Sequence, residues 1–269
     1  MVWHNGLLSK LEKVEVKCCM ANFIHSLLEN RSLSVLVGNQ LSERYSLDNG
    51  TPQGSVISPT LFNIMIDDLF EHVSDKRINT SKFADDGAIW VAHRELSTIR
   101  TLLQETLNGV STWCDKWGFT ISPEKTIGVL FRRKGVNSDT PRLTVRGKRV
   151  KFEKSAKFLG VTFDQYLTWS KHADNLYARC QKDLNAMRAI RGSSWGANRK
   201  TLLTLYRSLI RSKLEYGCEA FHNASKTTLM RLESIQYQAL KIATGAGRDW
   251  RATAENQERT AHPQLLEQM

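Results

Sequence analysis

The pattern of apolar residues changes near residue 166, and this change limits the folds that the chain can adopt. Before it, short stretches with the two-residue period of strands alternate with stretches of helical period. After it, every apolar stripe has helical spacing, as in Ala173, Leu176, Cys180 and Leu184. We therefore expect a mixed α/β region over residues 1–165 and a small helical bundle over residues 166–245. The apolar stripe then stops, so we expect a disordered tail over residues 246–269.

The first region predicts an ordered series of short elements. Turn residues such as Gly38-Asn39, which indicates a tight hairpin, separate the periodic stretches. The expected helices cover residues 4–30 (one or two helices), 58–74 and 95–117. The expected strands cover residues 32–37, 40–48, 78–83, 87–92, 126–131, 143–145, 149–152 and 157–163.

Two adjacent aspartates, Asp85 and Asp86, lie where one expected strand turns into the next. At a tight turn one carboxylate can project into a cleft while the other supports it. Carboxylate oxygens are the ligands that Mg²⁺ prefers, and phosphoryl and nucleotidyl transfer depend on such ions. An ordinary surface turn is the alternative. The apolar neighbours argue against it; they are Phe83, Ala84, Ala88, Ile89 and Trp90.

A second candidate site is the loop that contains Pro52, Gln53 and Gly54. Proline stiffens the loop, glycine allows a close backbone approach, and the glutamine amide can both donate and accept hydrogen bonds. These properties suit contact with a nucleotide or a template base. Taken alone, the same three residues also describe a plain turn.

Charge is distributed unevenly along the chain, whose net charge is +11. Residues 1–120 carry 11 Lys/Arg against 14 Asp/Glu, whereas residues 121–269 carry 27 against 13. The basic excess is densest between Arg132 and Lys157. Lysine and arginine that neutralise phosphates release counterions, so this asymmetry indicates a polyanionic partner such as nucleic acid. A solvated basic face is the other interpretation.

Other global features exclude several classes of protein. Five cysteines without a CxxC pair argue against a disulfide framework or a zinc site, and favour a reducing compartment. No apolar run approaches the roughly 20 residues that a membrane helix needs. The first residues lack the pattern of a secretory signal. We therefore expect an intracellular protein with no membrane partner.

Several short sequences occur in an order that resembles the reverse transcriptases of non-LTR (LINE-type, jockey-like) retrotransposons. The first two are GTPQGSVISPTLFN at residues 50–63 and FADD at residues 83–86. They are followed by Trp113, WG at 117–118, SPEKT at 122–126, KFLGV at 157–161, LEYG at 214–217 and QALKIATG at 238–245. The resemblance covers about residues 1–245. It implies a polymerase palm with an antiparallel sheet and helices on one face, followed by a helical thumb.

The resemblance also implies roles for the candidate residues. Asp85 and Asp86 would bind Mg²⁺, with Mn²⁺ as an alternative, and Lys125 would assist catalysis near the triphosphate. Pro52, Gln53 and Gly54, together with Phe83 and Ala84, would line the nucleotide and template side. Leu159 and Gly160 would contact the primer end. The partners implied are an RNA template, a DNA primer, their RNA–DNA duplex and a dNTP, in a nuclear or cytoplasmic ribonucleoprotein.

The resemblance further indicates a missing part. Members of the family carry another aspartate in a palm strand that precedes the segment matching residues 2–8, and fingers before that strand. We therefore expect a fragment of an RNA-directed DNA polymerase that is inactive alone. Asp67 and Asp68 diverge on their expected helix and do not replace the aspartate. A non-catalytic nucleic-acid-binding remnant is the alternative. A phosphohydrolase is disfavoured, because no His or Glu ligand cluster lies near residues 80–90.

Overall fold

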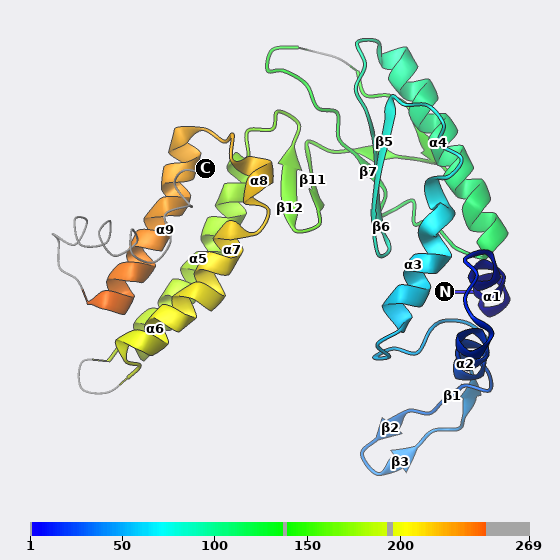
Figure 1. Cartoon of the computed structure of the whole chain (residues 1–269). Helices are drawn as coiled ribbons and strands as arrows, with labels where there is room; N and C mark the ends of the chain where they lie inside the picture. Colours follow the sequence, from blue (N-terminus) through cyan, green and yellow to red (C-terminus); the bar gives the residue numbers. More distant parts are fainter. Residues whose placement is uncertain (1, 137–138, 193–195, 246–269) are drawn as a thin grey trace. The chain divides into compact units, whose positions relative to one another are not determined.

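The computed structural model describes residues 2–136, 139–192 and 196–245, which Figure 1 colours from blue to orange. The chain forms two compact units. The first comprises Met1–Gly128 and Ser138–Phe152, and the second comprises Val129–Asn137 and Glu153–Met269. The expected boundary after residue 165 falls within the second unit, whereas the assignment of a palm and a thumb stays a prediction. The expected disordered tail, 246–269, lies outside the described residues.

Helices of the first unit share one apolar core. Residues 4–30 form two helices, as the periodicity allows: α1 spans His4–Lys13 and α2 spans Cys18–Leu28. They pack with α3, Ser58–Ile66, and with the end of α4, Leu96–Trp117. The buried apolar residues of this core are Val2, Leu7, Leu11, Ile24, Leu28, Leu61, Met65 and Trp117.

The helix expected over residues 58–74 is shorter than predicted. It ends at Ile66 and continues only as the 3₁₀ turn η1, Asp67–Phe70. The ammonium groups of Lys10 and Lys82 donate to the carbonyl oxygens of Met65, Ile66 and Asp67 in this segment. These lysines satisfy acceptors that a continuing α-helix would use, so the helix can stop here without leaving them unpaired.

The described strands pair only in twos. Five pairs are antiparallel: β1 (Ser32–Leu33) with β4 (Tyr45–Ser46), β2 (Leu36–Val37) with β3 (Gln40–Leu41), β5 (Ile78–Phe83) with β6 (Asp86–Val91), β8 (Thr144–Val145) with β9 (Lys148–Arg149), and β11 (Ser155–Phe158) with β12 (Val161–Asp164). The sixth, β7 (Ile127–Gly128) with β10 (Lys151–Phe152), is parallel. The expected α/β fold with antiparallel strands is therefore confirmed, but the strands form small separate pairs, because most are two residues long and each pairs with one neighbour.

The second unit is built around helices, with the β11–β12 hairpin packed against them. Its long helices are α5, Ser170–Ile190, and α9, Lys226–Thr244, which lie side by side in Figure 1. Between them the chain forms α6 (Arg199–Leu205), the π-helical η2 (Tyr206–Arg211), α7 (Ser212–Glu215) and α8 (Cys218–Phe221). The predicted apolar stripes are confirmed, since Leu184, Ile210 and Ile235 are fully buried.

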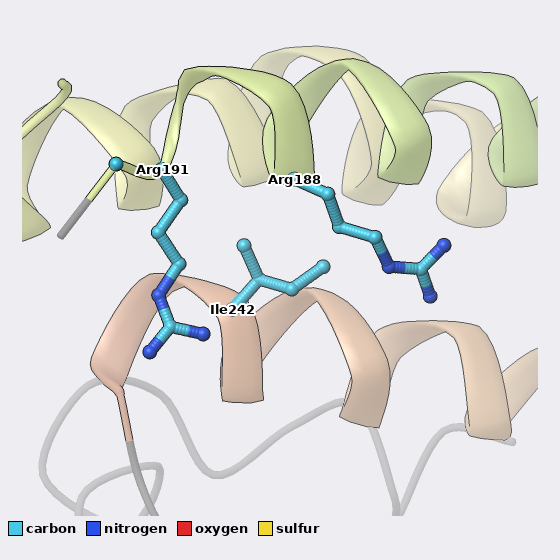
Figure 2. Close-up of a pocket in the computed structure, with 4 residues that line it drawn as sticks. Arg188, Arg191 and Ile242 are labelled. Atoms are coloured by element: carbon cyan, nitrogen blue, oxygen red, sulfur yellow. The ribbon is translucent and has the colours of Figure 1, made fainter.

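A pocket of about 350 Å³ lies where α5 ends beside α9. Figure 2 shows Arg188 and Arg191 extending toward α9 on either side of Ile242. Arg188 donates to Asn185 at 2.7 Å and to Gln238 of α9 at 3.0 Å, which holds its guanidinium in place. The pocket is therefore lined by two arginines, and the guanidinium of Arg188 is held in a defined position.

Across the described residues, every helix is either too short or too polar to cross a lipid bilayer.

Candidate catalytic site

The turn between β5 and β6 carries the predicted catalytic aspartates. Phe83 pairs with Asp86, so Ala84 and Asp85 are the two central residues of the turn. Ala84 has φ +49°, a value that is uncommon for a residue with a Cβ atom. A positive φ at only the first central position is the pattern of a type II′ hairpin turn. Asp85 therefore occupies the tip, and Asp86 begins the returning strand.

The apolar neighbours of the aspartates do not bury the turn, which corrects the expectation drawn from them. Phe83, Ala84, Asp85 and Asp86 are all exposed, and Phe83 retains 64% of its accessible surface. The reason is that β5 and β6 form an isolated pair, and α4 packs against β6. Among the described residues, neither carboxylate has a hydrogen-bond or ion-pair partner, so both are open to a ligand.

The chemistry of the Asp85 and Asp86 side chains is compatible with part of a metal site. Mg²⁺ in such sites takes one or two carboxylates and completes its shell with water and substrate phosphates, and Asp85 and Asp86 offer oxygens of that kind. Within the part of the chain that the structure describes, however, no group of three or more His, Cys, Asp or Glu could hold a metal ion. The described residues therefore form no closed protein cage for a metal, and metal binding by Asp85 and Asp86 stays a prediction.

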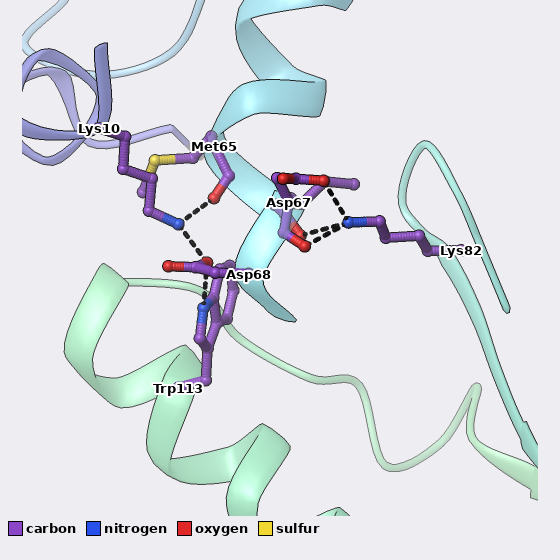
Figure 3. Close-up of polar contacts among 7 residues, drawn as sticks. Lys10, Met65, Asp67, Asp68, Lys82 and Trp113 are labelled. Atoms are coloured by element: carbon purple, nitrogen blue, oxygen red, sulfur yellow. Dashed lines mark hydrogen bonds and ion pairs between the residues drawn. The ribbon is translucent and has the colours of Figure 1, made fainter. Parts of the chain in front are cut away.

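Asp68 has a structural role and is not available for a metal. Its carboxylate accepts hydrogen bonds from the buried Lys10 ammonium at 2.5 Å and from the Trp113 indole N–H at 2.7 Å (Figure 3). The Lys10 ammonium also lies over the rings of Trp113 and Trp117, 4.9 and 4.2 Å from their centres. These cation–π contacts and the ion pair together compensate the burial of a lysine.

The two partners respond to burial in different ways. Burial lowers the pKa of Lys10 even though the hydrogen bond to Asp68 acts in the opposite direction. For Asp68, burial raises the pKa, but hydrogen bonds from Lys10 and Trp113 outweigh it and leave the pKa below its ordinary value. Desolvation is therefore decisive for the lysine, and hydrogen bonding is decisive for the aspartate.

Asp67 points to a different partner, as the expected divergence of the two side chains requires. Its carboxylate pairs with Lys82 at 2.9 Å, and Figure 3 shows this contact apart from the one between Lys10 and Asp68. Lys82 lies on β5, close in sequence to the Asp85-Asp86 turn. Sequence reasoning missed Lys10 and Lys82, because their partners are far along the chain and no local pattern indicates the pairing.

The Pro52-Gln53-Gly54 loop is anchored at both ends and open in the middle. At one end, the Gly50 carbonyl oxygen accepts from His4 at 2.7 Å and from Arg31 at 2.9 Å. At the other, the Ser58 hydroxyl donates to the Pro52 carbonyl oxygen at 2.7 Å. Gln53 and Gly54 are exposed, and Gly54 has φ +87° in open space. Glycine is therefore favoured at position 54 by the positive φ of the backbone, not by a lack of space for a side chain.

Lys125 lies in the exposed turn that precedes β7. Its backbone N–H donates to the Ser122 hydroxyl at 3.4 Å, whereas its ammonium has no partner among the described residues. No hydrogen bond or ion pair in that part of the chain joins Lys125 or the Pro52-Gln53-Gly54 loop to the Asp85-Asp86 turn. All three features belong to the first unit, and their joint action stays a prediction.

Leu159 and Gly160 form the two-residue turn between β11 and β12, so the single strand expected over residues 157–163 is wrong. Both residues have positive φ, +45° and +83°, the pattern of a type I′ turn. The Tyr216 hydroxyl donates to the Leu159 carbonyl oxygen at 2.9 Å. Tyr216 was not among the predicted site residues; an exposed aromatic followed by glycine at the end of a helix was the available signal.

The chain is similar to known reverse transcriptases and to RNA-directed DNA polymerases of mobile elements. A family model described as "Reverse transcriptase (RNA-dependent DNA polymerase)" matches residues 1–163. The chain is 30% identical over 254 residues to a probable RNA-directed DNA polymerase from transposon BS of Drosophila melanogaster. It is 27% identical over 256 residues to the RNA-directed DNA polymerase from mobile element jockey of the same species. These alignments cover 90% and 91% of this chain but 27% of each relative.

A more distant similarity extends to another group of elements. The chain is 23% identical over 181 residues to a retrovirus-related Pol polyprotein from type-1 retrotransposable element R1 2 of Nasonia vitripennis. That alignment covers 66% of this chain and 44% of the relative.

Proposed function

The chain belongs to the reverse transcriptase (RNA-dependent DNA polymerase) family, and we propose that it carries part of the machinery for extending a DNA primer on an RNA template. The observation that carries the proposal is the Asp85–Asp86 pair, which is exposed at the β5–β6 turn and has no hydrogen-bond or ion-pair partner among the described residues. The other pair of adjacent aspartates in the first unit differs, because Asp68 pairs with Lys10 and Asp67 pairs with Lys82. Free carboxylates at the tip of a hairpin are available to bind a divalent ion.

In this proposal, Asp85 and Asp86 hold Mg²⁺ or Mn²⁺. When bound, such an ion orients the triphosphate of a dNTP and stabilises the charge that develops on the leaving pyrophosphate. The Lys125 ammonium neutralises part of the same charge. Pro52, Gln53 and Gly54, with Phe83 and Ala84, contact the nucleotide and the template.

The remaining regions hold nucleic acid. We propose residues 1–165 as part of a palm and residues 166–245 as a thumb, with Leu159 and Gly160 at the primer end. Arg188 and Arg191 line a pocket where phosphate oxygens could accept from their guanidinium groups. The basic residues between Arg132 and Lys157 add attraction for the duplex backbone. The setting of this activity would be a ribonucleoprotein in the nucleus or the cytoplasm.

Binding of the correct nucleotide tests the proposal directly. The assay uses the purified chain, an RNA template with a labelled DNA primer ending in a dideoxynucleotide, and Mg²⁺. We expect the dNTP that complements the template base to strengthen duplex binding, and Asp85→Asn to abolish this gain. Asp75→Asn is the matched control, since Asp75 is another aspartate of the first unit and pairs with Arg77. An equal response to all four dNTPs, or an unchanged response in Asp85→Asn, would contradict the proposal.

Primer extension tests whether the carboxylates of this chain suffice for synthesis. We propose that they do not, because the described residues hold no group of three metal ligands. The purified chain, incubated with a poly(rA) template, an oligo(dT) primer, dTTP and Mg²⁺, is expected to add no nucleotides. Robust incorporation that Asp85→Asn removes would show that the site is complete.

A second candidate function is nucleic-acid binding without catalysis. It is favoured by the basic excess in residues 121–269, where 27 Lys/Arg face 13 Asp/Glu. This function predicts duplex affinity that falls steeply with salt and is unaffected by dNTP, Mg²⁺ or Asp85→Asn. The nucleotide-binding experiment therefore separates the two functions.

A further inference from the structure

The turn at Leu159 and Gly160 has an unfavourable composition for its conformation. Type I′ turns favour Asn-Gly or Gly-Gly, because both central residues need a positive φ. Here the first central residue is leucine, at φ +45°. A leucine adopts this region only where surrounding contacts hold it. Something outside the hairpin must therefore stabilise the turn.

Tyr216 and Gly217 supply those contacts. The Tyr216 hydroxyl donates to the Leu159 carbonyl oxygen at 2.9 Å. A Cβ atom on Gly160 would lie 3.0 Å from the Tyr216 ring, and one on Gly217 would lie 2.8 Å from a methyl group of Val161. The turn and the Tyr216-Gly217 segment thus lie close together, and each contains a glycine at positive φ, +83° for Gly160 and +71° for Gly217. The Tyr216 ring therefore contacts the turn through a hydrogen bond and through close packing, although much of the ring is exposed.

The helices behind Tyr216 give it a defined position. It directly follows α7, the end of the helical segment that begins with α6. That segment buries Leu202, Tyr206 and Ile210 in the core of the second unit. The Tyr216 side chain itself is 59% exposed, so it contributes little to the core. Its specific contribution is the hydrogen bond to the turn.

We propose that Tyr216 is a positioning residue that holds the Leu159–Gly160 turn in the conformation that meets the primer end. The inference rests on the proposed function, which places this turn at the primer. Tyr216 touches neither nucleotide nor metal in this scheme. It acts through its hydrogen bond to the Leu159 carbonyl oxygen. This bond links the position of the β11–β12 turn to the end of α7.

Tyr216→Phe tests the inference, because it removes the hydroxyl and keeps the ring. The matched control is Tyr237→Phe, which removes a hydroxyl that donates to Glu233 on α9 at 2.9 Å. Two properties are measured on the full chain: the backbone amide signals of Leu159, Gly160 and Val161, and the affinity for an RNA–DNA duplex with a recessed primer 3′ end. A blunt duplex of the same sequence is the reference ligand.

We expect Tyr216→Phe to shift the turn signals and to lower affinity for the recessed end by roughly two- to tenfold, the equivalent of one hydrogen bond. Affinity for the blunt duplex should stay unchanged, and Tyr237→Phe should alter neither property. Gly160→Ala strains the turn directly, because Gly160 has φ +83°, and should reproduce the selective loss. Circular dichroism of each variant checks that the helices remain folded.

Three results would overturn the inference. If the turn signals of Tyr216→Phe equal those of the wild type, Tyr216 does not hold the turn. If they shift while binding of the recessed end is unchanged, the turn does not position the primer. In both cases wild-type binding of the primer end leaves the proposed function intact. If the wild-type chain does not distinguish recessed from blunt ends, the proposed role of this turn fails and the inference fails with it.

Discussion

Two pairs of adjacent aspartates occur in the first unit, Asp67–Asp68 in η1 and Asp85–Asp86 at the β5–β6 turn. Each pair directly follows two apolar residues, Met65-Ile66 or Phe83-Ala84, and the two pairs are identical as dipeptides. In the 3₁₀ turn, Asp68 meets the buried Lys10 and Asp67 meets Lys82, whereas the described residues bring no cation to Asp85 or Asp86. The position of each pair in the fold decides this difference, since α1 and β5 each provide a lysine to η1, whereas no lysine or arginine of the described residues pairs with the hairpin tip.

The comparison shows that a carboxylate can stabilise a fold or bind a ligand, but one set of contacts does not serve both purposes. The Asp68 carboxylate forms an ion pair with the buried Lys10, and the fold would lose stability if a metal displaced Lys10. Asp85 and Asp86 are exposed and have no cationic partner among the described residues, so their carboxylates remain available to a bound cation. The substitutions described next change either these aspartates or the lysines that pair with them.

The largest effect is expected from Lys10→Met. Lys10 is 4% exposed, and its loss leaves the Asp68 carboxylate without a cation. We expect the free energy of unfolding to fall by about 2–4 kcal/mol, because breaking one side of a buried pair leaves the other charge uncompensated. Urea unfolding measures it, with the exposed Lys13→Met on the same helix as control. Equal effects of the two substitutions would show that Asp68 does not depend on Lys10.

A smaller effect, but one on ligand binding, is expected from Asp85→Asn combined with Asp86→Asn. We expect the affinity for Mn²⁺ to fall by more than roughly tenfold, because the anionic oxygens that the ion prefers are removed. The free energy of unfolding should change by less than about 0.5 kcal/mol, as for other exposed residues. Calorimetric titration with Mn²⁺ gives the affinity, and Asp67→Asn is the control. If Asp67→Asn lowers the affinity equally, the two pairs are not functionally distinct.

Acid should reduce the stability that the Lys10–Asp68 pair contributes to the fold. The folded pKa of Asp68 lies below its ordinary value of 3.8, so its contribution to stability is complete at neutral pH. That contribution is lost as the pH falls through 3.8 toward the folded pKa, with a slope of at most about 1.4 kcal/mol per pH unit for one proton. The stability gap between the wild type and Asp68→Asn, measured by urea unfolding from pH 7 to pH 2, should therefore narrow only in the acid range. A constant gap would contradict this origin.

The smallest effect is expected from Lys82→Met. The Asp67 side chain is 84% exposed and that of Lys82 is 32% exposed, so solvent screens their pair. We expect a loss of about 0–1 kcal/mol in the free energy of unfolding. A loss as large as that of Lys10→Met would mean that Lys82 supports the carbonyl groups of η1 more than it pairs with Asp67. Comparison with Asp67→Asn, which keeps Lys82, separates these contributions.

Local elements were predictable where a regular pattern is long enough. The helix expected over residues 95–117 is observed at Leu96–Trp117, and the strand expected over 78–83 is observed at Ile78–Phe83. The placement of Asp85 in a turn followed from the same periodicity. Its exposure did not follow, because the apolar neighbours Phe83 and Trp90 would be buried only if a further layer covered them.

Contacts between distant residues were beyond the reach of local patterns. The run from Lys157 to Phe163 looks like one continuous strand, since it lacks the Asn-Gly signal of a hairpin. It folds back at Leu159 because Tyr216 and Gly217, far along the chain, hold that turn. In the same way, Asp68 is distinguished from Asp85 only by the position of Lys10, which the sequence around either aspartate does not reveal.

The parallel pairing of β7 with β10 has a consequence for dissecting the molecule. β7 ends at Gly128 and β10 at Phe152, and after each of these residues the chain leaves the first unit for the second. The two exits are therefore neighbouring strand ends that run in the same direction. Cleavage after either strand leaves another covalent connection between the units, so proteolysis at one point does not separate them. Truncation at Gly128 would also remove Leu143, Val145 and Val150, whose apolar cluster packs with Leu103 and Leu107 of α4.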